Sequence, residues 1–403
     1  MQDFNLLERL VQISPGMEVW WDSSPLIFAS WCRRMLAKAD PGDREIMRRQ
    51  FARMYDPENP ERQLFRGVTT NPILSMDVIR DDEPRWRSIA ADIMRAHEGV
   101  DEESLFWLLY KEVVRRGSEM YLPLFEASRY REGFVSAQVD PRKSFDGAVM
   151  LEQALELRSI NPNVMIKIPG TTEGYGVIEE LTARGVPTNN TLTFVLSQLL
   201  DCAESVRRGV ERAKTQGVEL SKWRSVITYM LARFGELGGL LQKAGSEQSI
   251  ELSEGDVRLA ELAILKKAYR LIKDGGYQSK LLPCSLRNGP TINRQLRSWH
   301  LEEMTGADLV VTVPPFYVEE IVTFPSPENI EYLVNRIEVD TPKELLDRLM
   351  RIPYFERGYE ENGYTRAEYN SLPGLLMTAE EFSGATNQMV EFSRNCLANK
   401  QGA

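Results

Sequence analysis

The sequence has little cysteine or histidine, and it lacks a long hydrophobic run. Its four cysteines stand far apart with no CxxC pair, which is typical of reduced cytoplasmic thiols rather than of disulfides. The two histidines, His97 and His300, are in no ligand spacing, so we expect no metal site. No apolar run reaches the roughly 18 residues of a membrane span, and residues 1–12 are polar and acidic, unlike a secretory signal. We therefore expect a cytoplasmic protein with no membrane partner.

Positive charge is also scarce. The chain of 403 residues carries 49 Lys and Arg against 59 Asp and Glu, a formal net charge of −10. Because binding to nucleic acid requires clustered positive charge that replaces phosphate counterions, this balance predicts no nucleic-acid partner. It leaves room for a local basic pocket that takes a small anionic substrate.

Short β-branched runs alternate with long helical patterns along the whole chain. Eight such runs are predicted strands, and each is separated from the next by enough residues for a helical crossover: Val19–Asp22, Gly67–Asn71, Phe134–Val139, Val164–Ile168, Pro187–Thr193, Ser225–Met230, Leu281–Leu286 and Leu309–Val313. Eight strand–helix units predict an α/β protein, a single (β/α)8 TIM barrel over residues 1–403. An open doubly wound sheet is the alternative, but no GxGxxG turn follows any of these strands.

Two helices between the predicted strands carry clear end signals. Asp101 can cap a helix whose apolar side chains Leu105, Leu109 and Val113 lie on one face. Asp256 is the predicted start of a second helix, which Gly275 and Gly276 would end.

Two parts exceed a minimal barrel. Residues 28–63 predict a two-helix insertion after the first strand, broken at Pro41 and Gly42, and residues 330–403 predict a C-terminal helical extension. In the extension, Thr341–Glu344 and Thr378–Glu381 match the capping-box pattern at helix starts. The aromatic-rich segment 353–377 between them predicts irregular structure, either packed on the surface or covering the barrel mouth.

Polar side chains stand at the carboxyl ends of the predicted strands, where the active sites of such barrels are found. They include Asp22, Asn71, Gln138, Lys167, Thr193, Thr228, Arg233, Ser285 and Arg287. Strand alternation places Lys167 on the face opposite Val164, Ile166 and Ile168. If that face lines the barrel, burial lowers the pKa of Lys167, and a neutral amine is what Schiff-base chemistry needs. The alternative is a strand-end lysine whose charge reaches water.

Three other side chains have chemical and structural interpretations of their own. Asp22 suits an acid or base, or else a cap or an ion pair. Arg233 and Arg287 have the fork geometry that binds phosphate, although each taken alone is better explained as a surface or ion-pair arginine.

Five ordered segments between Glu18 and about Pro315 resemble the transaldolase family. They are GVTTNP at 67–72, VSAQVDPR at 135–142, IKIP with TTEG at 166–174, LTF at 192–194 and SLRN at 285–288. The resemblance implies a (β/α)8 barrel that moves a dihydroxyacetone unit from a ketose phosphate to an aldose phosphate, as in the pentose phosphate pathway. It implies no metal and no organic cofactor.

The resemblance also implies roles for individual residues. Lys167 would form the imine with the donor carbonyl, and Asp22 would take the C4 hydroxyl proton. Asn71 and Ser285 would hold the retained three-carbon unit, while Thr193 would support a catalytic water. Arg233 and Arg287 would bind the phosphate.

The sequence departs from the family pattern at four positions. Gln138 stands in place of a glutamate, and an amide can orient a water but cannot exchange protons with it. Met230 stands where the family has phenylalanine or, in fructose 6-phosphate aldolases, tyrosine, and Thr228 replaces a serine. Thr191 replaces an asparagine that holds the donor's hydroxyls, a role that Asn190 takes only if the register slips by one residue.

We therefore predict a class I Schiff-base enzyme acting on phosphorylated sugars, as a monomer or homodimer. Transaldolase-type transfer is the leading reaction. The alternatives are a fructose 6-phosphate aldolase-like lyase, a transaldolase for a specialised sugar phosphate, and a non-catalytic barrel that binds sugar phosphates.

Overall fold

The computed structural model describes residues 4–292, 295–323 and 334–401. Eight parallel strands form one sheet in the order β10-β1-β2-β3-β4-β5-β6-β7, and its two outer strands, β7 and β10, lie against each other. Their bounds are β1 Glu18–Trp21, β2 Phe65–Thr69, β3 Phe134–Gln138, β4 Val164–Pro169, β5 Thr188–Thr191, β6 Ser225–Tyr229, β7 Lys280–Pro283 and β10 Val310–Val313. This is the predicted (β/α)8 barrel, and all eight predicted strands are confirmed with ends that shift by a few residues.

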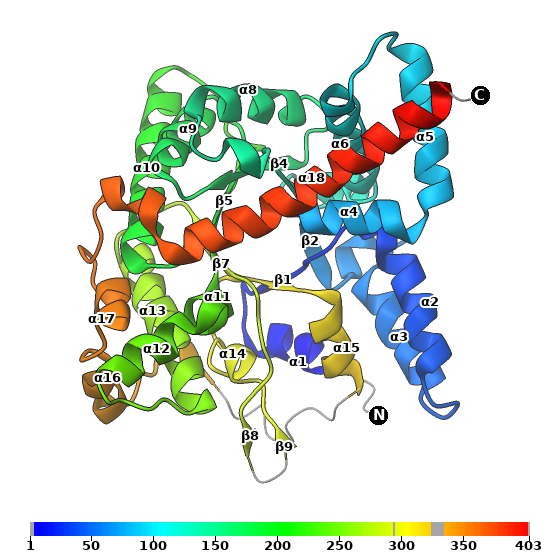
Figure 1. Ribbon diagram of the computed structural model, residues 1–403. Helices are drawn as coiled ribbons and strands as arrows, with labels where there is room; N and C mark the ends of the chain where they lie inside the picture. The colour runs from blue at the N-terminus through cyan, green and yellow to red at the C-terminus, as the bar shows by residue number, and fades with distance from the viewer. Residues whose placement is uncertain (1–3, 293–294, 324–333, 402–403) are drawn as a thin grey trace.

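Helices separate the strands and cover the outside of the barrel (Figure 1). The first half of the chain contains α1 Leu6–Ile13, α2 Phe28–Lys38, α3 Arg44–Met54, α4 Pro72–Asp81, α5 Glu83–Ala96, α6 Glu102–Glu119, α7 Leu122–Ala127, α8 Gly147–Arg158 and α9 Thr172–Ala183. The second half contains α10 Leu196–Thr215, α11 Leu231–Glu236, α12 Leu240–Glu247, α13 Glu254–Asp274, α14 Trp299–Glu302, α15 Pro315–Thr323, α16 Lys343–Leu349, α17 Pro353–Tyr359 and α18 Pro373–Gln401. A small hairpin of β8 Thr291–Ile292 and β9 Gln295–Leu296 precedes α14.

The interior of the barrel is layered along β1. Glu18, Trp20 and Asp22 alternate onto the same face of the strand, from its amino end to its carboxyl end. Trp20 is fully buried, and its ring lies so close to β2 that a Cβ added at Gly67 would come within 2.4 Å of it. The indole therefore separates a charged layer around Glu18 from the polar layer around Asp22.

The two helices predicted for residues 28–63 are present as α2 and α3, with the break around Pro41. They are held to the barrel by aromatic side chains. The ring of Trp31 lies 5.3 Å from that of Trp21 on β1 and 5.0 Å from that of Phe51 on α3. Packing of this kind stabilises helices that are too short to be stable alone.

Two of the predicted helix starts can be compared with the N-caps of α6 and α13. Asp101 caps α6, because its Oδ1 accepts a hydrogen bond from the Ser104 backbone N–H at 2.8 Å. The helix predicted from Asp256 begins earlier, since Ser253 is the N-cap of α13 and Asp256, the third residue of the helix, completes its capping box. The helix ends at Gly275, as predicted.

The predictions for the C-terminal extension were less accurate. Both capping boxes are wrong: α16 follows Pro342 with no side-chain cap, and α18 begins at Pro373, so that Thr378 lies within the helix. The segment 353–377 is not irregular but contains α17 and a 3-10 turn, Arg366–Ser371, which pack on α12, α13, α9 and α10 at the barrel's outer surface. The predicted start of the extension, residue 330, lies outside the described residues.

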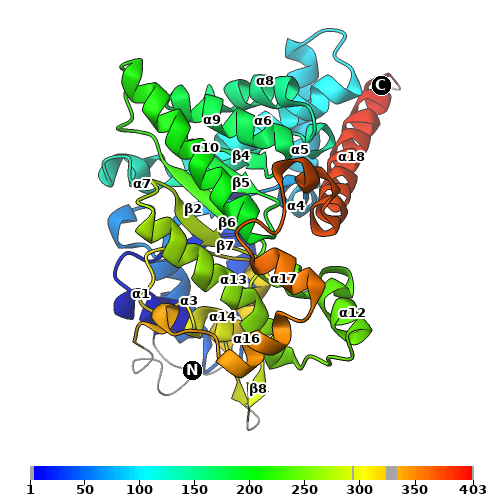
Figure 2. The same ribbon diagram turned by 90° about the vertical axis from the view of Figure 1, so that its left-hand side faces the viewer.

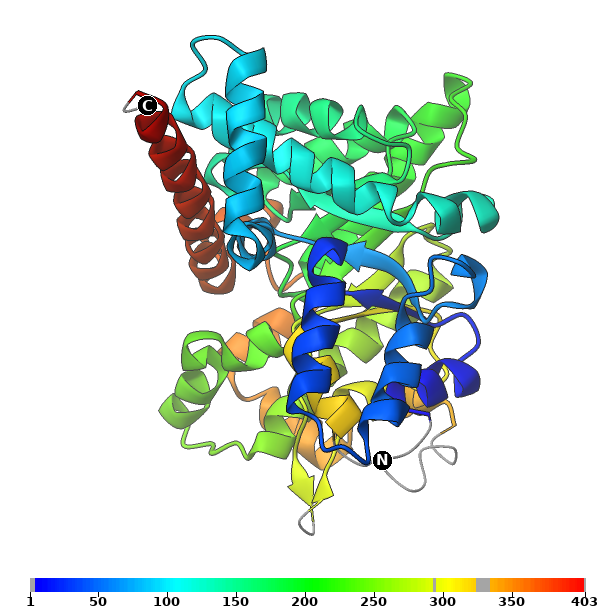
Figure 3. The ribbon, with the colours of Figure 1, turned by 90° about the vertical axis from the view of Figure 1, so that its right-hand side faces the viewer.

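Helix α18 crosses the carboxyl ends of the strands. In Figure 1 it runs across the molecule in front of the sheet, and Figures 2 and 3 show it along one side of the barrel. It contacts α4, α5 and α6. The segment that covers part of the barrel mouth is therefore the terminal helix. Among the helices of the described residues, none has the length and apolar character to cross a bilayer.

Candidate active site

A cavity of about 190 Å³ lies at the carboxyl ends of the barrel strands. Its wall brings together seven of the ten predicted site residues: Asp22, Asn71, Lys167, Thr228, Arg233, Ser285 and Arg287. Their positions in the sequence span more than 260 residues, and only the closing of the barrel makes them neighbours. The wall also includes residues that the sequence analysis did not select as site residues, among them Thr69, Cys284, Phe316 and Phe382.

Lys167 lies inside the barrel on β4, where it is 5% exposed. Its Nζ donates a hydrogen bond to the backbone oxygen of Thr70 at 3.1 Å. Burial lowers the pKa of the Lys167 amine, and the nearby charge of Arg233 lowers it further, while Asp22 opposes the shift. The site therefore shifts the Lys167 amine toward its neutral form.

Asp22 follows β1 and faces the same cavity. Its Oδ1 accepts a hydrogen bond from the Thr69 hydroxyl at 2.6 Å, and that hydroxyl lies 2.5 Å from the Thr312 hydroxyl. Burial raises the pKa of Asp22, whereas Lys167 and the Thr69 hydrogen bond hold it down. A carboxyl group with a raised pKa and a fixed orientation is suited to proton transfer.

Asn71 joins the site to helix α4. Its Oδ1 accepts a hydrogen bond from the Leu74 backbone N–H at 3.0 Å, so Asn71 is the N-cap of α4, with Pro72 at the first helical position. The cap fixes the carboxamide and leaves its NH2 group as the available donor.

The loop after β7 carries Ser285 and Arg287 into the cavity wall. Ser285 has φ of 59°, a left-handed conformation that is unusual for a residue other than glycine. The Arg287 backbone N–H donates to Nδ1 of His300 at 3.0 Å, so His300 carries its proton on Nε2, which lies 2.7 Å from Glu261. Both side chains of this pair are fully buried. Nothing in the local sequence pattern pointed to the pair, because Glu261 and His300 are 39 residues apart.

Each predicted phosphate-binding arginine faces a carboxylate. Arg233 pairs with Glu381 of α18, with Nη1 at 2.6 Å from Oε2 and Nη2 at 3.1 Å from Oε1. Arg287 has its Nε 3.5 Å from Oε2 of Glu236, and its guanidinium lies 5.2 Å from the ring centroid of Phe316. The Nη1 of Arg287 also donates to the backbone oxygens of Ser285 and Leu286, at 3.2 and 3.0 Å.

Three predicted site residues, Gln138, Thr193 and Asn190, do not line this cavity. The Thr193 hydroxyl donates to the backbone oxygen of Thr228. Gln138 pairs in register with Lys167, and neither its amide nitrogen nor its amide oxygen has a hydrogen-bond partner.

The register of β5 determines whether Thr191 or Asn190 faces the cavity. Asn189 pairs with Lys167, so Asn189 and Thr191 share the interior face, and Thr191 lines the cavity. Asn190 faces the other side, where its Nδ2 donates to the backbone oxygen of Ile168 at 3.2 Å. The slip of one residue that a substrate-binding role for Asn190 requires has not occurred.

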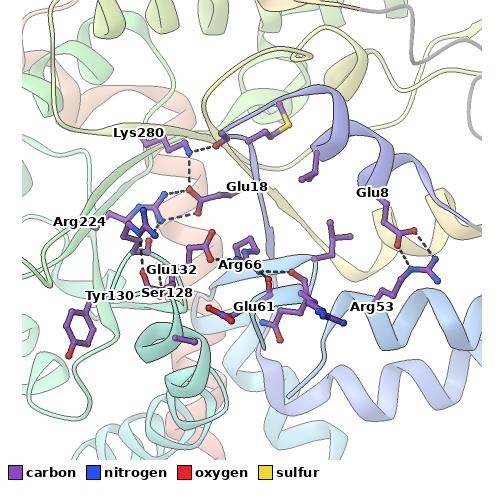
Figure 4. A pocket seen from close by; sticks show the side chains of 18 of the residues that line it. Glu8, Glu18, Arg53, Glu61, Arg66, Ser128, Tyr130, Glu132, Arg224 and Lys280 are labelled. Atoms are coloured by element: carbon purple, nitrogen blue, oxygen red, sulfur yellow. Dashed lines mark hydrogen bonds and ion pairs between the residues drawn. The ribbon is translucent and has the colours of Figure 1, made fainter. Parts of the chain in front are cut away.

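A larger cavity, of about 1060 Å³, lies at the opposite end of the barrel (Figure 4). Glu18 stands between two cations there, 2.6 Å from Arg224 and 2.9 Å from Lys280. Although burial raises the pKa of Glu18, these cations outweigh it and lower the pKa to about 2. Arg66 and Glu132 form a further ion pair in the same wall. At the amino ends of the strands such paired charges stabilise the barrel, so the smaller cavity is the candidate active site.

The fold and the site define a (β/α)8 barrel with a buried amine and a carboxyl group in one polar cavity. The sequence model described as "Transaldolase/Fructose-6-phosphate aldolase" matches residues 38–352. The chain therefore belongs to the transaldolase/fructose-6-phosphate aldolase family.

Curated relatives carry the same family name. The chain is similar to Transaldolase 1 of Streptomyces avermitilis, with 29% identity over 259 residues that cover 64% of this chain and 65% of the relative. It is also similar to Transaldolase 1 of Streptomyces coelicolor, at 30% identity over 64% of this chain and 65% of the relative. Transaldolase of Mycobacterium leprae matches at 30% identity over 64% of this chain and 66% of the relative. The matched region thus spans just under two thirds of the length of each relative.

Proposed function

We propose that this protein transfers a three-carbon dihydroxyacetone unit from a ketose phosphate to an aldose phosphate through a Schiff base on Lys167. One observation carries the proposal: Lys167 and Asp22 lie in the wall of one cavity, and burial shifts the pKa of each toward its neutral form. Family membership supports the same reaction class. A barrel that only binds sugar phosphates has no need for this pair.

In the proposed reaction, the neutral Lys167 amine attacks the C2 carbonyl of the ketose phosphate. Loss of water gives a protonated imine, which draws electrons from the C3–C4 bond. Asp22, as the carboxylate, takes the C4 hydroxyl proton, the C3–C4 bond breaks and an aldose phosphate leaves. The enamine that remains on Lys167 attacks the aldehyde of the acceptor, Asp22 returns the proton, and hydrolysis releases the new ketose phosphate.

The other cavity residues bind substrate in this proposal. The Asn71 NH2 group and the hydroxyls of Ser285 and Thr228 are placed to hold the hydroxyls of the retained unit. Arg287 and Arg233 bind the phosphate through their guanidinium groups.

In this proposal, two buried residues that do not line the cavity orient the water. The buried Gln138 amide, adjacent to Lys167 in register and without a partner, orients the water that leaves and re-enters at the imine. Thr193 supports this water from β5's carboxyl end.

A fructose 6-phosphate aldolase-like lyase is the second candidate. Gln138 favours it, because the fructose 6-phosphate aldolases that this sequence resembles also carry glutamine at this position. In such a lyase the enamine is protonated and released rather than passed to an aldehyde. Met230, and not a tyrosine, lines the cavity, while the Tyr229 hydroxyl donates to the backbone oxygen of Glu261 outside it. The position therefore has no phenol to protonate the enamine, which favours transfer.

The proposal also covers the cellular compartment and the partners of the enzyme. The four cysteines are free in the structure, which supports a reducing compartment such as the cytoplasm. Phosphorylated sugars are the proposed partners, and the choice between monomer and homodimer stays a prediction.

The test is a transfer assay with isotopically labelled fructose 6-phosphate, in the presence and absence of an aldose phosphate acceptor. Transfer predicts a labelled ketose phosphate, detected by mass spectrometry, only when acceptor is present. Release of dihydroxyacetone at the same rate without acceptor would replace the transferase with the lyase. A wild-type protein that does neither would refute both reactions.

A further inference from the structure

Three residues on one face of α18 surround the guanidinium of Arg233. Thr378, Glu381 and Phe382 are spaced three and four residues apart, so they lie on the same side of the helix. The Thr378 hydroxyl lies 3.3 Å from Nη1 of Arg233, and the Phe382 ring centroid lies 5.8 Å from the guanidinium carbon. Both Thr378 and Phe382 are buried, and Phe382 lines the active-site cavity.

Glu381 binds Arg233 in the way that a phosphate would. Two of its oxygens face two nitrogens of the guanidinium, at 2.6 and 3.1 Å, which is the bidentate arrangement that arginine also offers to phosphate. A phosphate therefore meets Arg233 only through another edge of the guanidinium or by displacing the carboxylate. The Glu381 side chain is 45% exposed, so its carboxylate can turn toward solvent.

The position of the carboxylate is set by the helix rather than by the ion pair alone. Helix α18 is anchored along its length by contacts with α4, α5 and α6. Breaking the pair leaves these contacts in place, so Glu381 stays close to a phosphate bound at this end of the cavity.

We propose that Glu381 is a specificity-determining residue, an internal anion that competes with the substrate phosphate for Arg233. This inference rests on the proposed function, in which Arg233 and Arg287 bind that phosphate. Glu381 lowers the affinity for phosphorylated sugars and leaves the binding of unphosphorylated ketoses unchanged. It thus sets how strongly the enzyme prefers one over the other.

Glu381→Gln tests the proposal by a gain of affinity, which structural damage does not produce. The variant keeps the size of the side chain and removes its charge. We expect inorganic phosphate to bind about 3- to 30-fold more tightly in a calorimetric titration. KM for a ketose phosphate falls by a similar factor, with KM for the unphosphorylated ketose unchanged.

Two further variants isolate the contact. Glu380→Gln removes the same charge from the exposed neighbour on the same helix and is expected to leave phosphate affinity within twofold of wild type. In an Arg233→Gln background, the gain from Glu381→Gln is expected to disappear, because there is no guanidinium left to compete for.

Unchanged or weaker phosphate binding in Glu381→Gln would overturn the proposal. So would an equal gain in Glu380→Gln, which would reduce the effect to net charge. A wild type that does not act on sugar phosphates would refute the proposed function, whereas the phosphate titration would still decide the role of Glu381.

Discussion

Replacing Gln138 with glutamate restores an acid–base group beside Lys167. The two residues are register partners on neighbouring strands, which lie about 4.8 Å apart, and the Gln138 amide has no hydrogen-bond partner. The new carboxyl group therefore replaces no existing contact. Because imine formation and hydrolysis both move protons to and from the C2 oxygen, we expect Gln138→Glu to speed these steps by up to about 10²- to 10⁴-fold.

The same substitution changes the charge state of Lys167. A carboxylate about 5 Å from the amine, at an effective dielectric constant of about 20, stabilises the ammonium ion by about 3 kcal/mol. That energy corresponds to an upward shift of about two units in the pKa of Lys167. The pH at which imine formation becomes efficient should rise accordingly, so the gain in rate is largest at alkaline pH.

Pre-steady-state kinetics on one donor and acceptor pair, across a range of pH, measures both effects. Gln138→Met is the matched control, because it keeps the shape but cannot orient water, and it should slow hydrolysis of the imine. If Gln138→Glu is slower than wild type at every step and every pH, the reasoning is refuted, and Gln138 is tuned to a different reaction or substrate.

Two other perturbations probe separate ends of the barrel. Arg287→Ala should lower kcat/KM for a ketose phosphate, because it removes about 2–4 kcal/mol of transition-state stabilisation, and it should change kcat/KM for the unphosphorylated ketose little. Equal losses of kcat/KM on both substrates would contradict a phosphate contact. At the amino end of the barrel, the pKa of Glu18 is about 2 in the folded protein, compared with an ordinary value of 4.5. The ion pairs of Glu18 therefore stabilise the folded protein fully above about pH 5, and this stabilisation is lost as the pH falls toward 2. Glu18→Gln should therefore lower the free energy of unfolding, measured in urea, by about 3 kcal/mol at pH 7. The difference in stability between wild type and variant should shrink steadily as the pH falls. A difference that does not depend on pH would show that the ion pairs of Glu18 are not responsible.

The barrel was predictable because its signals are local. Each parallel strand is buried on both faces and reads as a short apolar run, and a lysine within such a run, Lys167, is conspicuous. Alternation along β4 was enough to predict that Lys167 and Ile166 point in opposite directions. The same alternation applies to Tyr229 on β6, whose hydroxyl donates to the backbone oxygen of Glu261 on α13 at 3.3 Å.

The parts that were missed depend on contacts between distant residues. Thr378 and Glu381 match a capping box by their spacing, but the helix begins at Pro373, and both side chains contact Arg233 instead. Arg233 and Glu381 are 148 residues apart, so no local pattern reveals the pair. The support that His300 gives to the Arg287 backbone is of the same kind. Side chains at the mouth come from loops and from a helix that crosses the barrel, and their partners are set by the tertiary structure.

The central claim is that Lys167 forms a covalent imine with the substrate. The most direct measurement is borohydride reduction during incubation with a ketose phosphate, followed by mass spectrometry of the proteolytic peptides. We expect one adduct, on Lys167, which Lys167→Arg abolishes while the circular dichroism spectrum stays the same. Lys266→Arg, at a buried lysine paired with Glu303 outside the cavity, should retain the adduct. An adduct on any other lysine, or undiminished trapping in Lys167→Arg, would contradict the account.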